Sequence, residues 1–110
     1  MDIATSQRLT QYSGMKKYEK LLQYSDPRRV LEAARRHGYE PDSIYVSPLA
    51  SKKYMAIDSQ GKRHHFGQMN YEDYTKHRDK ERRDNFLKRN ARWATAAKWT
   101  PAHLAYFTLW

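Results

Sequence analysis

A chain of 110 residues can form only one small domain with a modest hydrophobic core. Its formal net charge of +9 favours encounter with phosphates, anionic lipid head groups or acidic protein surfaces, and its 14% aromatic residues argue against a disordered chain. Because the sequence has no cysteine, no hydrophobic signal core and no long apolar run, it excludes disulfides and thiolate metal sites and predicts a reducing, non-secretory location without a membrane span.

The N-terminal part is expected to contain two helices. Residues 1–13 are polar and show no periodicity, which is typical of a flexible arm. Apolar residues then recur at helical spacing between Met15 and Leu22, which predicts a short amphipathic helix. A second helix is expected to begin at Asp26, a capping residue followed by proline, and to stop at Gly38.

The middle of the chain predicts β structure. Residues 39–50 contain two prolines and a brief apolar run at 44–46, so we expect a loop or a short edge strand. Alternating residues over 53–58 and 62–66 predict a β-hairpin, with Gly61 adopting a positive φ angle at its turn. An isolated hairpin is marginally stable in water, and one of its faces is therefore expected to rest on a helix.

Helical patterning returns in the C-terminal half. Asn70 as a cap and Asp73 three residues later predict a short helix over about 71–77. Asp79 is expected to cap a longer helix that runs to about Ala94.

The last segment is almost wholly apolar or aromatic. It begins with Thr100 and a proline, which repeats the pattern of a capped helix start. Residues 102–110 are too few to span a membrane, so they must dock on the body, on a second copy or on a partner. For a partner, the predicted binding residues are Leu104, Tyr106, Phe107, Leu109 and Trp110.

These elements predict an α+β fold, namely a small, mostly helical domain with one β-hairpin and a C-terminal docking helix. We divide the chain into a flexible N-terminal arm (1–13), a helical pair with a loop (14–50), and a core of hairpin and helices that ends in the apolar tail (51–110).

Catalytic and metal sites are not indicated. His64, His65 and His77 with Asp73 and Asp79 are suitable metal ligands by type, but adjacent residues in a strand point to opposite faces. The chain also lacks a P-loop, a GxSxG elbow and an HExxH pair. We expect a non-enzymatic protein with no metal and no cofactor.

Arg82, Phe86, Arg89 and Trp93 follow one another at steps of four, three and four, which places them on one stripe of a helix. Such a stripe suits single-stranded nucleic acid, because bases stack on rings and arginines hold phosphates. It also suits internal packing, which we favour, with the arginine heads paired to Asp73, Asp79 or Asp84.

Other cations are expected on outward helix faces, where they would bind nucleic acid or an acidic surface or simply remain solvated. The predicted binding residues are Arg28, Arg29, Arg35, Arg36, Lys88 and Arg92.

Taken together, several of these residues resemble an uncharacterised family of small basic proteins of large double-stranded DNA viruses. The shared pattern, over about Lys52 to Trp110, comprises His65-Phe66-Gly67, Tyr71, Asp73-Tyr74-Thr75, His77, Asp79, Arg82-Arg83, Arg89 and Leu109-Trp110. The family offers no established activity to carry over.

The resemblance implies a viral context. In that context we expect a non-enzymatic structural protein of the virus particle, either a minor capsid or an internal virion protein, that bridges larger viral structural proteins. It would be located in the virion, and in the host cytoplasm or nucleus during assembly. The alternative is a sequence-independent accessory protein that binds nucleic acid, DNA included, and its oligomeric state is left open.

Overall fold

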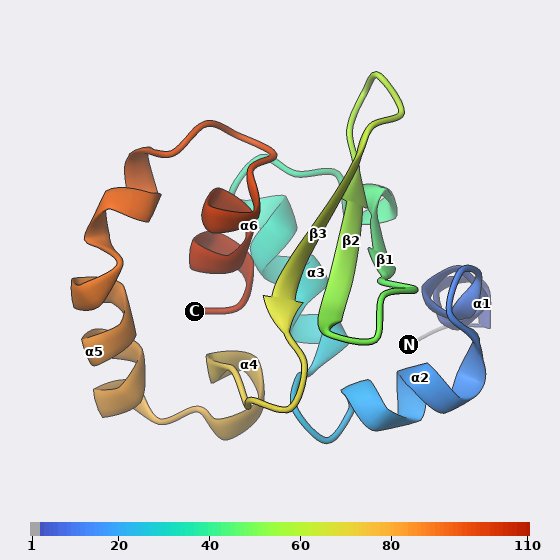
Figure 1. Cartoon of the computed structure of the whole chain (residues 1–110), viewed down its shortest axis with the longest axis horizontal. Coiled ribbons are helices and arrows are strands. Elements are labelled where there is room, and N and C mark those ends of the chain that lie inside the picture. The colour runs from blue at the N-terminus through green and yellow to red at the C-terminus, as the bar shows by residue number, and fades with distance from the viewer. Residues whose placement is uncertain (1–2) are drawn as a thin grey trace.

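The computed structural model describes residues 3–110, with side-chain surroundings from Gln7 onward. Its elements, in chain order, are α1 (Ile3–Thr10), α2 (Gly14–Leu21), α3 (Pro27–Arg36), the 3-10 turn η1 (Pro41–Ser43), β1 (Ile44–Val46), β2 (Lys52–Ile57), β3 (Arg63–Gln68), α4 (Tyr74–His77), α5 (Lys80–Arg89), the 3-10 turn η2 (Ala91–Thr95) and α6 (Pro101–Thr108). The α+β fold class predicted from the sequence is confirmed (Figure 1).

One antiparallel sheet organises the molecule, with the strand order β1-β2-β3. Tyr54 on β2 lies opposite Val46 on β1 and Phe66 on β3. The predicted hairpin is confirmed, Gly61 has a φ of 81° at its turn, and the run at 44–46 forms the edge strand. The sheet thus joins the two predicted segments 14–50 and 51–110 into a single structure.

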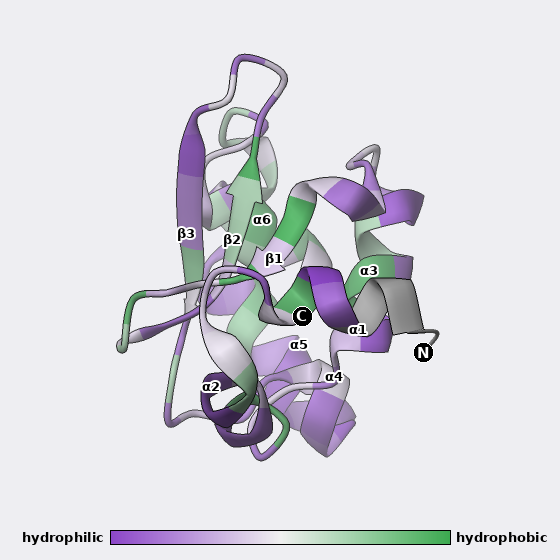
Figure 2. Cartoon of the chain, turned by 90° about the vertical axis from the view of Figure 1, so that its right-hand side faces the viewer, coloured by the Kyte–Doolittle hydropathy of each residue, from purple (hydrophilic) through white to green (hydrophobic). Residues whose placement is uncertain are grey.

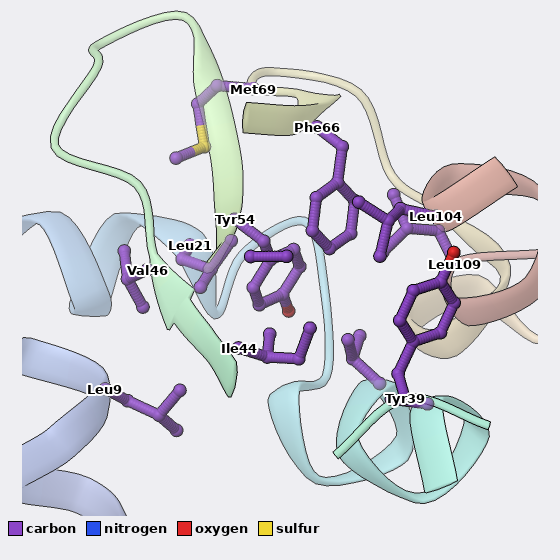
Figure 3. Close-up of a cluster of buried hydrophobic side chains, with 13 residues drawn as sticks. Leu9, Leu21, Tyr39, Ile44, Val46, Tyr54, Phe66, Met69, Leu104 and Leu109 are labelled. Atoms are coloured by element: carbon purple, nitrogen blue, oxygen red, sulfur yellow. The ribbon is translucent and has the colours of Figure 1, made fainter. Parts of the chain in front are cut away.

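The central strand β2 is covered on both faces, because its residues 53–56 are all buried. On one face, the rings of Tyr54 and Phe66 stack with their centroids 5.7 Å apart. Leu104 and Leu109 from the C-terminal segment pack into the same cluster, which Figure 3 shows from within. On the face that carries Met55, Tyr12 packs edge-on against Tyr45 at 5.1 Å.

The expected flexible N-terminal arm is replaced by α1. Leu9 on this helix is 0% exposed and belongs to the core cluster. The sequence pattern missed α1 because one buried leucine among polar residues gives no periodicity. Residues 1 and 2 of the expected arm lie outside the described residues.

The predicted start and stop of α3 are confirmed. The Asp26 side chain accepts a hydrogen bond from the Arg28 backbone N–H at 3.1 Å, and Gly38 has a φ of 83° just beyond the helix. The buried face of α3 carries Val30, Ala33 and Ala34, and the arginines of this helix lie at exposed positions outside that face.

The segment after β3 differs from its prediction. Asn70 adopts a φ of 76° and does not cap a helix; Asp73 is the N-cap residue of α4 instead. The long helix expected to reach Ala94 ends at Arg89, where the Asn90 side chain donates to the Phe86 carbonyl at 3.0 Å, and η2 follows. Competition of an asparagine amide for the helix carbonyls explains this earlier stop.

The predicted C-terminal docking helix is confirmed as α6, and of the three docking places left open by the sequence it occupies the body of the protein. Thr100 caps it by accepting a hydrogen bond from the His103 backbone N–H at 3.3 Å, and it packs against α3 and β3. Figure 2 shows β2 and α6 as hydrophobic elements, whereas α2 is strongly hydrophilic. In the part of the chain that the structure describes, no helix has the length and hydropathy of a membrane span.

Several histidines at these packing interfaces have lowered pKa values. The Tyr39 hydroxyl oxygen accepts a hydrogen bond from the Trp99 backbone N–H, and the same hydroxyl is hydrogen-bonded to Nδ1 of His103. Burial lowers the pKa of His103, and His37 and Lys98 nearby lower it further. Burial is likewise the main cause of the lowered pKa values of His65 and His77.

We therefore predict that stability decreases as the pH falls through about 6.5, the pKa of histidine in the unfolded chain. Between that value and the lower folded-state pKa values, the unfolded chain binds more protons, so acid favours unfolding. Urea denaturation at about pH 8 and about pH 5.5 measures the effect. His103→Gln is expected to reduce the difference, and equal midpoints at both pH values for the wild-type protein would contradict the prediction.

Candidate functional site

A groove of about 770 Å³ opens between β3, α5 and α6 and is the main concave feature that we consider as a site. Five of its lining residues are aromatic, namely Phe66, Tyr71, Phe86, Trp93 and Trp110. Phe66 is buried at the base, and Tyr71 is 64% exposed at the rim. Three cations, Lys52, Arg82 and Arg89, line it with them, and a fourth, Lys53, is paired with Asp73. We call this feature the aromatic groove.

The helical stripe predicted from the sequence forms one wall of the groove. Arg82, Phe86, Arg89 and Trp93 all line it. The Phe86 and Trp110 rings stack face to face, with centroids 4.2 Å apart and planes at 8°. Trp93 meets Phe86 edge-on at 5.8 Å. The Phe86, Trp93 and Trp110 rings are therefore fixed by their contacts with one another, and all three also line the groove.

The arginines of the stripe do not make the expected pairs with aspartates. Asp73 pairs with Lys53, and Asp79 caps α5 by accepting from the backbone N–H groups of Glu81 and Arg82. Among the described residues, arginine ion pairs are limited to Arg28 and Arg29 with Asp26. The guanidinium groups of Arg82 and Arg89 thus keep their charge available to a ligand.

A buried ion pair supports the floor of the groove. Lys53 Nζ lies 3.2 Å from Asp73 Oδ2, with the two side chains only 3% and 1% exposed. Burial lowers the pKa of Lys53, and the Asp73 carboxylate opposes that change. Lys53 also donates to the carbonyl of Tyr71, which holds the rim of the groove in place.

Hydrogen bonds extend this ion pair into a network that joins three elements. The Thr75 hydroxyl donates to Asp73, and its oxygen accepts from the Asp26 backbone N–H at 2.9 Å. The Ser25 and Tyr54 hydroxyls are 2.6 Å apart and complete the network. Burial raises the pKa of Tyr54 well above its usual range, so its hydroxyl stays protonated at neutral pH. The network fixes β2, α3 and α4 relative to one another.

Close packing also sets the width of the groove at its β3 edge. Gly67 has a φ of 80°, and a Cβ at this position would lie 2.9 Å from Leu109 Cδ1 and 3.2 Å from Lys53 Cβ. Only glycine combines this backbone conformation with so close an approach. β3 and the end of the chain can therefore pack in contact.

The exposed cations predicted to bind nucleic acid or acidic surfaces do not form one patch with the groove. Arg28, Arg29, Arg35 and Arg36 are exposed on α3, and Lys88 and Arg92 are exposed on α5 and η2. None of these six residues lines the aromatic groove. Arg29 and Arg36 instead line a second cavity, described below.

The residues predicted to bind a partner through the tail are partly unavailable. Leu104 is 0% and Leu109 is 2% exposed, so both are used in the core of the chain itself. Tyr106, Phe107 and Trp110 are half-buried. The prediction is therefore wrong for the two leucines, because the tail docks on the body and buries them there.

The candidate metal ligands are dispersed. His64 Nε2 pairs with Asp58 Oδ2 at 2.8 Å, His65 Nδ1 lies 2.8 Å from Ser47 Oγ, and His77 Nδ1 accepts from the Asp79 backbone N–H. Within residues 3–110, no three histidine or carboxylate side chains are placed to hold a metal ion together. These histidines act as ties between neighbouring segments.

Over residues 43–90, the chain resembles a family of unknown function, DUF5754. This segment runs from β1 to the end of α5, so it contains the sheet and the Arg82–Phe86–Arg89 wall of the groove. The matched segment begins at residue 43, before Lys52, where the pattern noted in the sequence begins. It ends at residue 90, before α6 and Trp110. The description of the family names no virus. The curated proteins and the solved structures contain no match to the chain.

Proposed function

We propose that the chain is a non-enzymatic protein that binds single-stranded nucleic acid in the aromatic groove without reading its sequence. The supporting observation is the alternation of Arg82 and Arg89 with Phe86 and Trp93 along one wall. Every base presents a π-face that can stack on such rings, and every nucleotide presents a phosphate that arginine can neutralise.

The groove favours a single strand over a duplex. Its rings can stack only on bases whose faces are free, and in a duplex those faces are covered by neighbouring base pairs. Its charge also favours a polyanion, because Glu72 alone is acidic among the described lining residues, and Lys53 is neutralised by Asp73. The chain as a whole carries +9, which accelerates association with nucleic acid.

Fluorescence titration with a single-stranded oligothymidylate and with a duplex of the same length tests the proposal. The single strand is expected to bind more tightly and to quench tryptophan emission, since Trp93 and Trp110 line the groove. The slope of log Kobs against log salt is expected to be about −2, because each of the three groove cations contributes about −0.7 for a single strand.

Three outcomes would reject the proposal. Equal or tighter binding of the duplex would assign binding to the outer cationic helix faces, and no binding of either oligonucleotide at low salt would exclude nucleic acid. An acidic peptide serves as a third ligand. If it binds more tightly than the single strand, the groove recognises protein instead.

A second proposal keeps the viral context implied by the sequence resemblance, namely a structural protein that bridges larger subunits of a DNA virus particle. With Leu104 and Leu109 buried, its apolar anchors would be Met15, Leu22 and Leu49, which are 58%, 40% and 47% exposed. Mass spectrometry of purified particles tests this proposal, and complete absence of the chain from the virion would reject it.

A further inference from the structure

A second cavity, of about 550 Å³, lies between α3, α4, α5 and α6. Four arginines from separate parts of the chain line it: Arg29 and Arg36 on α3, Arg78 at the end of α4, and Arg83 on α5. We call this cavity the arginine pocket. Like charges gathered from distant segments make the cavity electropositive, and an electropositive cavity favours an anionic ligand.

Acidic side chains of the protein offset only part of this charge. Glu32 is the one acidic residue among the described residues that line the pocket. The nearest ion pair is that of Arg29 Nε with Asp26 Oδ2, which is long at 3.8 Å. Even if both carboxylates are assigned to the pocket, four guanidinium groups leave an excess of positive charge.

Two of the arginines are already held in place by the backbone. Arg29 Nη1 donates to the Thr75 carbonyl at 3.0 Å, and Arg83 Nε donates to the Trp110 carbonyl at 2.8 Å. Each of these guanidinium groups retains further N–H donors. A donor set that is ordered before binding loses less conformational entropy when a ligand arrives.

An aromatic ring positions the other side of the pocket. The guanidinium carbons of Arg78 and Arg83 lie 4.5 Å and 5.3 Å from the centre of the Tyr74 ring. Arg78 itself has a φ of 58°, a left-handed backbone conformation that directs the chain from α4 into α5. The packing of Tyr74 thus brings two cations from neighbouring helices to the same cavity.

We propose that the arginine pocket is a second binding site, which takes a phosphate monoester. Arginine forms paired hydrogen bonds with phosphate oxygens, and a monoester carries close to two negative charges at neutral pH. The volume exceeds that of a phosphate group, and the rings of Tyr106 and Phe107 line the remaining space. The group attached to the phosphate is therefore expected to be flat or aromatic, as in a nucleotide.

Two sources supply this chemistry, a free nucleoside monophosphate and the terminal phosphate of a nucleic acid strand. The site does not depend on the aromatic groove, because none of its four arginines lines that groove. Phosphate binding would persist if the proposed strand binding in the groove were wrong. The two proposals therefore fail separately.

Calorimetric titration at constant ionic strength tests the site, with inorganic phosphate and thymidine monophosphate as ligands. The double variant Arg36→Gln/Arg78→Gln is expected to bind both about tenfold more weakly than the wild-type protein, since two charge-assisted contacts are lost. Arg28→Gln/Arg35→Gln removes the same charge from exposed positions that do not line the pocket, and it is expected to bind as the wild-type protein does.

Oligothymidylates with and without a terminal phosphate distinguish the two sources. A gain in affinity from the terminal phosphate that disappears in Arg36→Gln/Arg78→Gln assigns the site to strand ends, and no gain assigns it to free nucleotides. The proposal is overturned if the wild-type protein binds neither small ligand at about 10 mM. It is equally overturned if the control variant loses as much affinity as the pocket variant.

Discussion

Replacing Asp73 with alanine is expected to lower the free energy of unfolding by about 3–5 kcal/mol, because it leaves the Lys53 ammonium buried without its carboxylate. The Thr75 hydroxyl loses its acceptor in the same variant. A typical domain of this size is stable by only about 5–15 kcal/mol, so this loss is a large fraction of the total. Urea denaturation measures it directly.

The pH dependence of the Asp73→Ala variant identifies the cause of this loss. Without the carboxylate, the pKa of Lys53 in the folded protein falls further, while it stays at about 10.4 in the unfolded chain. Between these values the unfolded chain binds more protons, so the variant should regain stability as the pH rises, more steeply than the wild-type protein. Asp84→Ala, at an exposed position on α5, is the matched control and should change stability by less than about 0.5 kcal/mol. A similar loss in both variants would contradict the role of the ion pair.

The double variant Arg82→Gln/Arg89→Gln is expected to weaken binding of a single-stranded oligonucleotide by about 10- to 100-fold, since two arginine–phosphate contacts are removed. The slope of log Kobs against log salt should become shallower by about 1–2. Both side chains are exposed and form no ion pair among the described residues, so the fold should tolerate the change. Fluorescence titration at two salt concentrations gives both quantities.

Lys88→Gln/Arg92→Gln provides the matched control for this experiment. It removes the same charge from nearby exposed positions that line neither cavity. A small loss is expected, because overall charge still contributes to long-range attraction. A larger loss in this control than in the groove variant would restore the outer faces of α5 and η2 as the binding surface predicted from the sequence.

Features that depend on residues close together in the sequence could be predicted well. The starts of α3, α5 and α6 follow from Asp26, Asp79 and Thr100, because a cap acts on N–H groups two or three residues away. The hairpin follows from alternation on both sides of Gly61. The predicted stripe of Arg82, Phe86, Arg89 and Trp93 lines one wall of the groove for the same reason, since helical periodicity is local.

Features that depend on tertiary contacts could not be predicted. The remaining lining of the groove includes Lys52, Tyr71 and Trp110, which show no regular spacing in the sequence. Lys53 and Asp73 are 20 residues apart in the sequence, and only the fold brings the two side chains together. The sequence predicts Asn70 as a cap, whereas its left-handed conformation depends on how the chain leaves β3.

The helix α5, which forms one wall of the groove, contains no buried residue. Its packing contacts include the stack of Phe86 on Trp110 and the hydrogen bond from Arg83 to the Trp110 carbonyl. Helices with few buried apolar contacts open by local unfolding at a free energy well below that of the whole domain. The wall that carries the arginine stripe should therefore exchange its amide hydrogens before β2 does, and a bound strand should slow that exchange selectively.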